Sequence, residues 1–196
     1  MQSLLPLALF AFVSSITPGP NNIMLTSSGI LFGFVRSIPH MLGITAGFGL
    51  LLALCASGIG SLILAVPSIH ALLKVLGSSY LVYLAWQLRR MAFRQTEQAD
   101  EKPMSFIGAA AFQFANPKAW VMAITGASAF LPLIQPTWLA VTLFCAVFCL
   151  VNLPCIGLWA GTGALLRRYL AQPKWQGIFC VVMVILTAYS AIAIWL

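Results

Sequence analysis

The sequence is poor in charge, and above all in negative charge. Only 7% of its 196 residues are Asp, Glu, Lys or Arg, while 61% are hydrophobic. This composition excludes an ordinary soluble domain, in which about a quarter of the residues are charged. The three acidic residues, Glu97, Asp100 and Glu101, lie together in one polar stretch. Every long apolar segment is therefore free of carboxylates.

The five cysteines lack the spacing of a metal or redox site. Cys145 and Cys149 are one helical turn apart, which would also suit a redox pair in a membrane thiol oxidoreductase. The chain has no CxxC pattern and no His/Cys cluster. We therefore interpret the thiols as packing residues and expect no cofactor, no metal and no enzymatic activity. A cysteine-free variant that still functions would eliminate the oxidoreductase.

Long apolar segments fill most of the chain, and there is room for six at roughly 20 residues each. The fold class predicted is an all-α integral membrane protein with six transmembrane helices. The expected spans are approximately Leu4–Phe32, Pro39–Ala65, Ile69–Leu88, Ser105–Leu131, Thr137–Leu166 and Trp175–Trp195.

The basic residues indicate how the spans are oriented. A net charge of +7 would also suit nucleic acid or anionic lipid as a partner. With six spans, however, eight of the ten basic residues fall in loops on one side, which the positive-inside rule assigns to the cytoplasm. We expect a bacterial inner-membrane protein with both termini periplasmic, no nucleic-acid partner and no cleaved signal peptide. The eight are Arg36, Arg89, Arg90, Arg94, Lys102, Arg167, Arg168 and Lys174.

Two apolar spans are interrupted by proline. The first contains Thr17-Pro18-Gly19-Pro20-Asn21-Asn22, and the fourth contains Asn116-Pro117-Lys118. Proline lacks the N–H group and its ring clashes with the preceding turn, so neither helix is expected to continue through its motif. Backbone interrupted at membrane depth must bind protein groups, water or a solute. We therefore predict that the two breaks face each other and hold a small transported molecule.

The polar stretch 92–104 divides the chain into halves, 1–91 and 105–196, of three expected spans each. Because three is odd, the halves would have opposite orientations, and each would have its first helix interrupted. Inverted repeats with proline-interrupted segments at corresponding positions are typical of transporters with a midplane site. Asn152-Leu153-Pro154 is expected to form a third polar interruption, and Gly43 and Gly47 to allow close helix packing.

Lys118 is the most informative residue, because it lies near mid-depth of the fourth span. A lysine at the centre of a membrane helix costs about 2.5–3.5 kcal/mol on insertion scales and normally faces a cavity or a partner. It could snorkel to the surface, or bind carbonyls freed by the proline as a structural charge. We favour a direct role in binding a substrate carboxylate, assisted by the free N–H groups that begin the half-helices after Pro20 and Pro117.

The remaining polar candidates are asparagines, namely Asn21, Asn22, Asn116 and Asn152. They could bind an ammonium group or a side chain, or they could simply hold helices together. With one cation and no counter-carboxylate, the site is expected to take a small, net-neutral zwitterion. Coupling to protons would have to use Lys118, His40 or His70, and we favour Lys118.

Three motifs together resemble the lysine exporter and homoserine/threonine exporter (LysE/RhtB) family. They are T-P-G-P-N-N in the first span, G-S-S-Y-L-V-Y-L-A-W in the third and F-Q-F-A-N-P-K in the fourth. The T-P-G-P-N-N-I and S-F-I-G-A-A-A-F-Q-F stretches look closest to the cysteine/O-acetylserine exporter subgroup.

The resemblance implies export of amino acids or their derivatives, driven by an ion gradient. It matches Pro18, Gly19 and Pro20 to the family's first-span motif and Asn116, Pro117 and Lys118 to its fourth-span motif. Many members have an acidic residue where this chain has Asn21 or Asn152, which argues against export of basic amino acids. A passive channel for zwitterions and a structural membrane subunit are the competing hypotheses, and the oligomeric state stays open.

Overall fold

The computed structural model describes residues 4–58 and 102–166, together with isolated helical positions between 75 and 86 and between 177 and 188. Within these ranges the chain is helical, as expected, and contains no strand. Apart from these isolated positions, the expected third and sixth spans lie outside the described residues, as do His70 and most of the 92–104 linker. The helices are α1 (Leu5–Ile16), α2 (Pro20–Phe32), α3 (Phe34–Ala56), α6 (Phe106–Ala115), α7 (Pro117–Phe130) and α8 (Thr137–Leu166).

Two of the described helices, α3 and α8, are long and apolar enough to cross a membrane. They have 23 and 30 residues and mean hydropathies of 1.8 and 2.4. At 1.5 Å per residue they extend about 35 and 45 Å, against a hydrocarbon core of about 30 Å. By contrast, α1 and α6 have only 12 and 10 residues, so each is too short to cross alone.

Both predicted interruptions are present, because a residue that precedes proline is disfavoured in the helical region. Thr17 (ψ 143°) and Gly19 (φ −175°, ψ 177°) are extended before Pro18 and Pro20. Asn116 (φ −89°, ψ 105°) is extended before Pro117. Helix α1 therefore ends at Ile16 and α2 starts at Pro20, while α6 ends at Ala115 and α7 starts at Pro117.

The prediction of a third interruption, at Asn152-Leu153-Pro154, was wrong. Helix α8 continues through Pro154, as α3 continues through Pro39. A single proline removes one hydrogen bond, which a membrane helix tolerates when neighbouring groups compensate. The other two motifs disturb the helix more strongly. Pro18 and Pro20 restrict two residues in close succession, and Asn116 before Pro117 is an asparagine that starts a new helix.

The expected bounds of the second span also need correction. Helix α3 begins at Phe34 rather than Pro39, so Arg36 lies in its first turn and not in a loop. The helix ends at Ala56 rather than Ala65. Gly58, with φ +88°, accounts for this end, because glycine readily adopts the left-handed conformation that terminates a helix.

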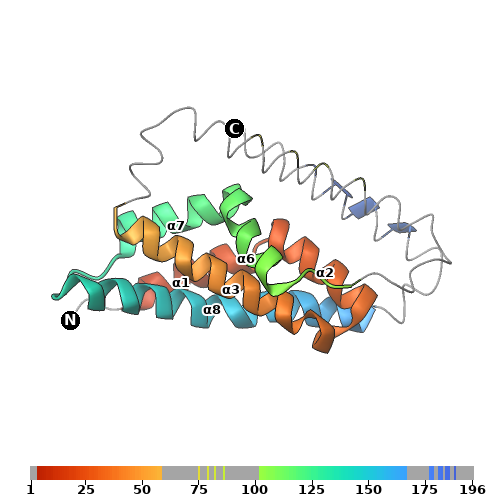
Figure 1. Cartoon of the computed structure of the whole chain (residues 1–196), viewed down its shortest axis with the longest axis horizontal. Helices are drawn as coiled ribbons and strands as arrows, with labels where there is room; N and C mark the ends of the chain where they lie inside the picture. Colours follow the sequence, from red (N-terminus) through yellow and green to blue (C-terminus); the bar gives the residue numbers. More distant parts are fainter. Residues whose placement is uncertain are drawn as a thin grey trace.

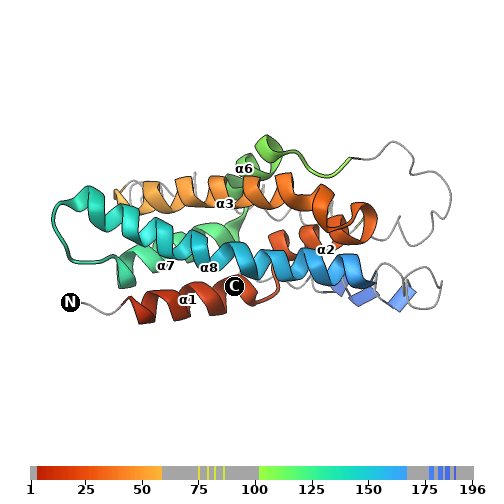
Figure 2. The ribbon, with the colours of Figure 1, turned by 90° about the horizontal axis from the view of Figure 1, so that it is seen from below.

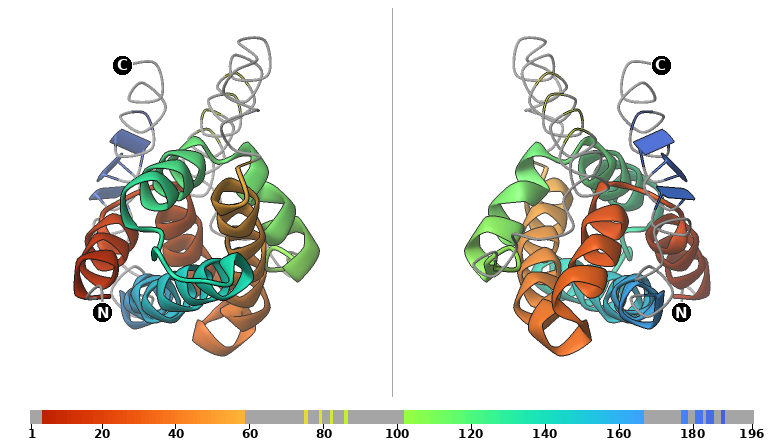
Figure 3. Two further views of the ribbon diagram at one scale, coloured as in Figure 1. Left: turned by 90° about the vertical axis from the view of Figure 1, so that its left-hand side faces the viewer. Right: turned by 90° about the vertical axis from the view of Figure 1, so that its right-hand side faces the viewer.

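The long helices α3 and α8 pack against each other, and each of the four described short helices packs against at least one of them. Helix α8 packs against α1, α2 and α3, and α3 also packs against α6 and α7. Figures 1 and 2 show α1 and α7 toward one end of the molecule and α2 toward the other. Seen along the long axis, α1, α7, α3 and α8 surround a common centre (Figure 3). The paired short helices α1–α2 and α6–α7 run in opposite directions (Figure 2).

Glycines allow the closest helix contacts. A Cβ atom added at Gly43 or Gly47 would collide with the backbone of Phe106 or Ala110 in α6, which confirms the close packing expected there. The α2–α8 contact is equally tight, since a Cβ at Gly163 would collide with the carbonyl of Thr26. Gly161, two residues away, has its nearest neighbour, a Phe34 ring carbon, 3.9 Å from an added Cβ.

These two glycines of α8 give a matched test of the packing. Gly163→Ala should destabilise the protein by about 1–3 kcal/mol, because overpacking a tight contact shifts the backbone. Gly161→Ala should be neutral or stabilising by up to about 1 kcal/mol, since alanine favours helix and the site has room. Thermal unfolding of the detergent-solubilised variants measures both. Equal melting temperatures would contradict the α2–α8 packing.

Candidate functional site at the two helix breaks

The two helix breaks meet through the side chain of Lys118. Its Nζ donates hydrogen bonds to Thr17 O (2.7 Å), Thr17 Oγ1 (3.0 Å) and Pro18 O (3.2 Å). Lys118 stands at the start of α7, whereas Thr17 and Pro18 join α1 to α2. The lysine amine thus binds carbonyls freed by the prolines, which is the structural alternative considered for it above. A role in binding substrate stays a prediction.

Side chains also satisfy the other carbonyls at the end of α1. Thr17 Oγ1 donates to Ser14 O at 3.0 Å. Asn22 Nδ2 donates to Ser15 O (3.0 Å) and Thr17 O (2.7 Å), and Trp159 Nε1 donates to Ile16 O (3.2 Å). The last four carbonyls of a helix have no partner within it. Here each has a donor from outside the helix, so the break is held in one conformation.

The two half-helices begin differently. Asn116 caps α7, because its Oδ1 accepts the Lys118 backbone N–H at 3.1 Å and its carbonyl accepts the Ala119 and Trp120 N–H groups. The free N–H groups expected after Pro117 are therefore occupied. Helix α2 follows Gly19 and has no capping side chain. The positive end of α2 is thus the more open of the two to an anion.

A pair of amides connects the two breaks on the other side. Asn21 Nδ2 donates to Gln113 Oε1 at 2.8 Å, and Gln113 Nε2 donates to Asn21 Oδ1 at 3.2 Å. The Gln113 side chain is fully buried and also donates to Ala109 O at 3.0 Å. This reciprocal pair fixes the start of α2 against α6.

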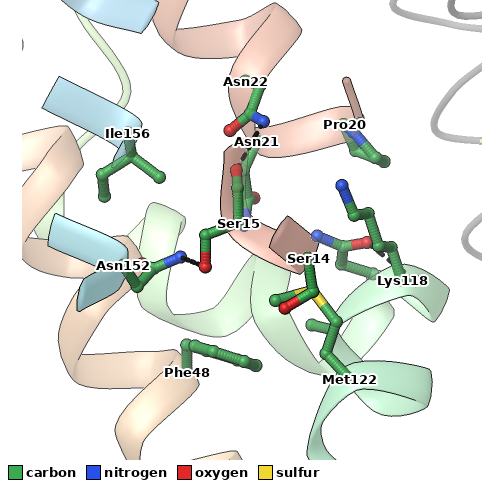
Figure 4. Close-up of a pocket in the computed structure, with 13 residues that line it drawn as sticks. Ser14, Ser15, Pro20, Asn21, Asn22, Phe48, Lys118, Met122, Asn152 and Ile156 are labelled. Atoms are coloured by element: carbon green, nitrogen blue, oxygen red, sulfur yellow. Dashed lines mark hydrogen bonds between the residues drawn. The ribbon is translucent and has the colours of Figure 1, made fainter. Parts of the chain in front are cut away.

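A pocket with about 320 Å³ of empty space, its opening included, lies where the breaks meet near the middle of α3 and α8. Figure 4 shows the Lys118 amine on one side of this pocket and the Ser15–Asn152 pair on the other. The lining is polar at the breaks and at Asn152 of α8, and otherwise apolar along α3, α7 and α8. Its residues are Ser14, Ser15, Gly19, Pro20, Asn21, Asn22, Phe48, Asn116, Lys118, Ala119, Met122, Asn152 and Ile156.

Asn152 provides an unsatisfied polar atom at the pocket. Its Nδ2 donates to Ser15 Oγ at 3.0 Å, while its Oδ1 is buried and without a hydrogen-bond partner among the described residues. A buried polar atom without a partner costs free energy and is rare in native structures. Its place in the lining makes it a candidate contact for a bound solute.

The structure brings together the residues that the sequence singled out. Of these, Gly19, Pro20, Asn21, Asn22, Asn116, Lys118 and Asn152 line the pocket. Thr17 and Pro18 are outside the lining but accept hydrogen bonds from Lys118, and Pro117 begins α7.

Sequence reasoning missed Ser14, Ser15 and Gln113. Polar residues within apolar helices close to a proline break were the available signal for all three. The apolar wall of the pocket could not be predicted either. Its residues Phe48, Met122 and Ile156 look like ordinary core residues until the positions of the helices are known.

Among the residues that the structure describes, no thiol and no imidazole lines this pocket. The thiols of Cys145 and Cys149 contact the carbonyls of Gly49 and Thr45, each at 3.8 Å. This contact between α8 and α3 agrees with a packing role. His40, fully inside α3 and only 2% exposed, does not line the pocket.

Apolar helices interrupted in mid-course around a polar pocket are typical of membrane transporters. A family model described as "LysE type translocator" matches residues 12–193. The chain belongs to this family of membrane translocators, which confirms the resemblance drawn from its motifs.

Curated relatives cover nearly the full chain. The cysteine/O-acetylserine efflux protein of Escherichia coli K12 is 32% identical over 188 residues, which are 94% of this chain and 93% of the relative. The protein of the same name from Shigella flexneri serotype 5b (strain 8401) is 32% identical over 197 residues, with 96% and 98% coverage. No solved structure matches the chain.

Gly19→Ala tests whether the position of the Lys118 amine matters. An added Cβ would lie 2.7 Å from Lys118 Cδ and 3.0 Å from Nζ, so the flexible lysine must move. The extended backbone of Gly19 suits alanine equally well, and folding should be retained. Since a misplacement of about 1 Å can cost a factor of about 100, transport in membrane vesicles should fall by roughly tenfold or more.

The control for this variant is a double-mutant comparison. If Gly19→Ala acts through the lysine, it should add no further loss to Lys118→Ala. Unchanged transport in Gly19→Ala, or additive losses in the double variant, would contradict the interpretation.

Proposed function

We propose that this protein is a secondary transporter that exports small, net-neutral amino acids or their derivatives across the bacterial inner membrane. The substrates would resemble cysteine, O-acetylserine or threonine. The observation that carries the proposal is the pocket at the meeting of the two helix breaks, in which Lys118 is the one charged residue of the lining. The names of the relatives, cysteine/O-acetylserine efflux proteins, support the same substrate class.

The charge of the pocket selects the charge of the substrate. All acidic residues of the chain lie between 97 and 101, so none belongs to a described helix. A cationic amino acid would meet Lys118 without a counter-charge, at a position where charges are costly. A zwitterion brings its own carboxylate. The Lys118 amine and the uncapped start of α2 would bind this carboxylate together.

The far wall of the pocket would bind the substrate side chain. It combines the unpartnered Oδ1 of Asn152 and the hydroxyl of Ser15 with the apolar side chains of Phe48, Met122 and Ile156. A short side chain with one polar group matches this mixture, because it leaves neither apolar surface nor hydrogen-bonding atoms unmatched. Cysteine, threonine and O-acetylserine have such side chains.

The positions of the basic residues support the proposed topology of six spans, two inverted halves and periplasmic termini. The start of α3, the segment leading into α6 and the end of α8 lie at the same end of the molecule (Figure 2). Arg36 and Lys102 belong to the first two of these, and Arg167 follows the third in sequence. This end would face the cytoplasm by the positive-inside rule.

Coupling to the proton gradient would use Lys118, the titratable residue of the pocket. The lysine would be protonated when it binds a substrate carboxylate and would exchange its proton during the change between the substrate-bound and empty states. A passive channel is the alternative, and in that case flux would follow the substrate gradient alone.

Transport by Lys118 variants tests this function. In everted membrane vesicles, we expect wild type to accumulate cysteine or O-acetylserine but not lysine or arginine, and a protonophore to abolish accumulation. Lys118→Met should lower the rate roughly thirtyfold or more, since removing one partner of a buried charge pair costs about 2 kcal/mol or more. Lys118→Arg, which keeps the charge, should retain part of the activity.

Three outcomes would contradict the proposal. Normal transport by Lys118→Met would remove the lysine from the site. Preference for lysine or arginine would refute the charge argument. Flux that ignores the protonophore and never exceeds the substrate gradient would identify a channel.

A further inference from the structure

The end of α1 binds the side-chain amine of Lys118. Three oxygen atoms, Thr17 O, Thr17 Oγ1 and Pro18 O, surround the Lys118 amine at 2.7, 3.0 and 3.2 Å. We call these three atoms the oxygen cradle. A lysine ammonium has three N–H donors and no acceptor, so the cradle offers one acceptor for each donor. The C-terminal end of α1 also favours positive charge.

The cradle is held in place by groups other than Lys118. Thr17 O also accepts a hydrogen bond from Asn22 Nδ2 at 2.7 Å, and Thr17 Oγ1 donates its own proton to Ser14 O at 3.0 Å. That donation leaves the hydroxyl oxygen free to accept. Pro18 and Pro20 fix the backbone on either side by restricting the residues that precede them. The three oxygens would therefore keep their positions without the lysine.

Two of the amide oxygens near the breaks already accept hydrogen bonds. Asn21 Oδ1 accepts from Gln113, and Asn116 Oδ1 accepts from the backbone of α7. The unpartnered Asn152 Oδ1 is on the opposite side of the pocket (Figure 4). An amino acid bound here needs acceptors for its α-ammonium group, and in the oxygen cradle three acceptors already converge on one ammonium group.

We propose that Lys118 occupies the subsite of the substrate α-ammonium group when the transporter is empty, and that the substrate binds by displacing it. This inference rests on the proposed function. The substrate ammonium, with the same three donors, takes the oxygen cradle, and the released Lys118 amine pairs with the substrate carboxylate. The exchange leaves no cation without a partner in either state, so its cost at membrane depth stays low. It also breaks the link between α7 and the α1–α2 break each time a substrate binds.

Ligand-induced stabilisation of purified Lys118→Ala tests the cradle directly. Removing the lysine should open the subsite to a free primary ammonium ion, for which ethylammonium is the probe. A tethered group competes at an effective concentration in the millimolar range or above. Half-maximal thermal stabilisation of Lys118→Ala should therefore need at least about tenfold less ethylammonium than wild type needs.

Two controls make the test specific. Tetramethylammonium has the same charge but no N–H donor, and it should not stabilise Lys118→Ala. Adding Thr17→Val removes one of the three acceptors while keeping the shape of the side chain, and it should weaken the ethylammonium effect. Equal stabilisation of wild type and Lys118→Ala, or equal effects of the two ammonium ions, would overturn the inference.

Transport by wild type separates this inference from the proposed function. Export of neutral amino acids by wild type, without ethylammonium binding to Lys118→Ala, would refute the cradle alone. Ethylammonium binding to Lys118→Ala, without export of any neutral amino acid by wild type, would support the cradle and refute the function.

Discussion

The structure depends on the satisfaction of backbone carbonyls where a helix stops in an apolar environment. Lipid offers no hydrogen-bond donor, so each carbonyl released by a break needs a donor from the protein, from water or from a solute. At the end of α1 these donors come from distant parts of the chain, namely Asn22 of α2, Lys118 of α7 and Trp159 of α8. The break therefore acts as the point at which three other helices are attached. A polar binding site can therefore form at the break without any additional separation of the helices.

How far the sequence predicts this arrangement depends on the range of the interaction. The breaks at Pro18, Pro20 and Pro117 were readable because proline acts on the residue before it. The same rule failed at Pro154, since tolerance of a proline depends on the packing around α8. The position of Lys118 on the break was foreseen as one of its alternatives. The particular carbonyls that Lys118 binds could not be foreseen, because they depend on how α7 is rotated about its own axis.

The role of Asn116 shows a similar limit. Its position before Pro117 indicates a helix start, yet from the sequence it was expected either to bind substrate or to hold helices together. The N–H groups after Pro117 were expected to be free for an anion. In the structure its side chain occupies one of the N–H groups that an anion would use. Gln113 is the converse case. A glutamine within an apolar helix needs a partner, but only the structure identifies that partner as Asn21.

The unequal capping of the two half-helices gives the pocket a direction. The open positive end of α2 and the Lys118 amine, which binds the carbonyl end of α1, lie on one side of the pocket, and the Asn152 side chain lies on the other (Figure 4). An amino acid whose carboxylate and ammonium groups bind at these helix ends has both groups fixed, so the configuration at its α-carbon decides where the side chain points. One enantiomer would direct its side chain to Asn152 and the other away from it. With amino acids bound as proposed, such a pocket would distinguish L- from D-amino acids without any residue dedicated to that purpose.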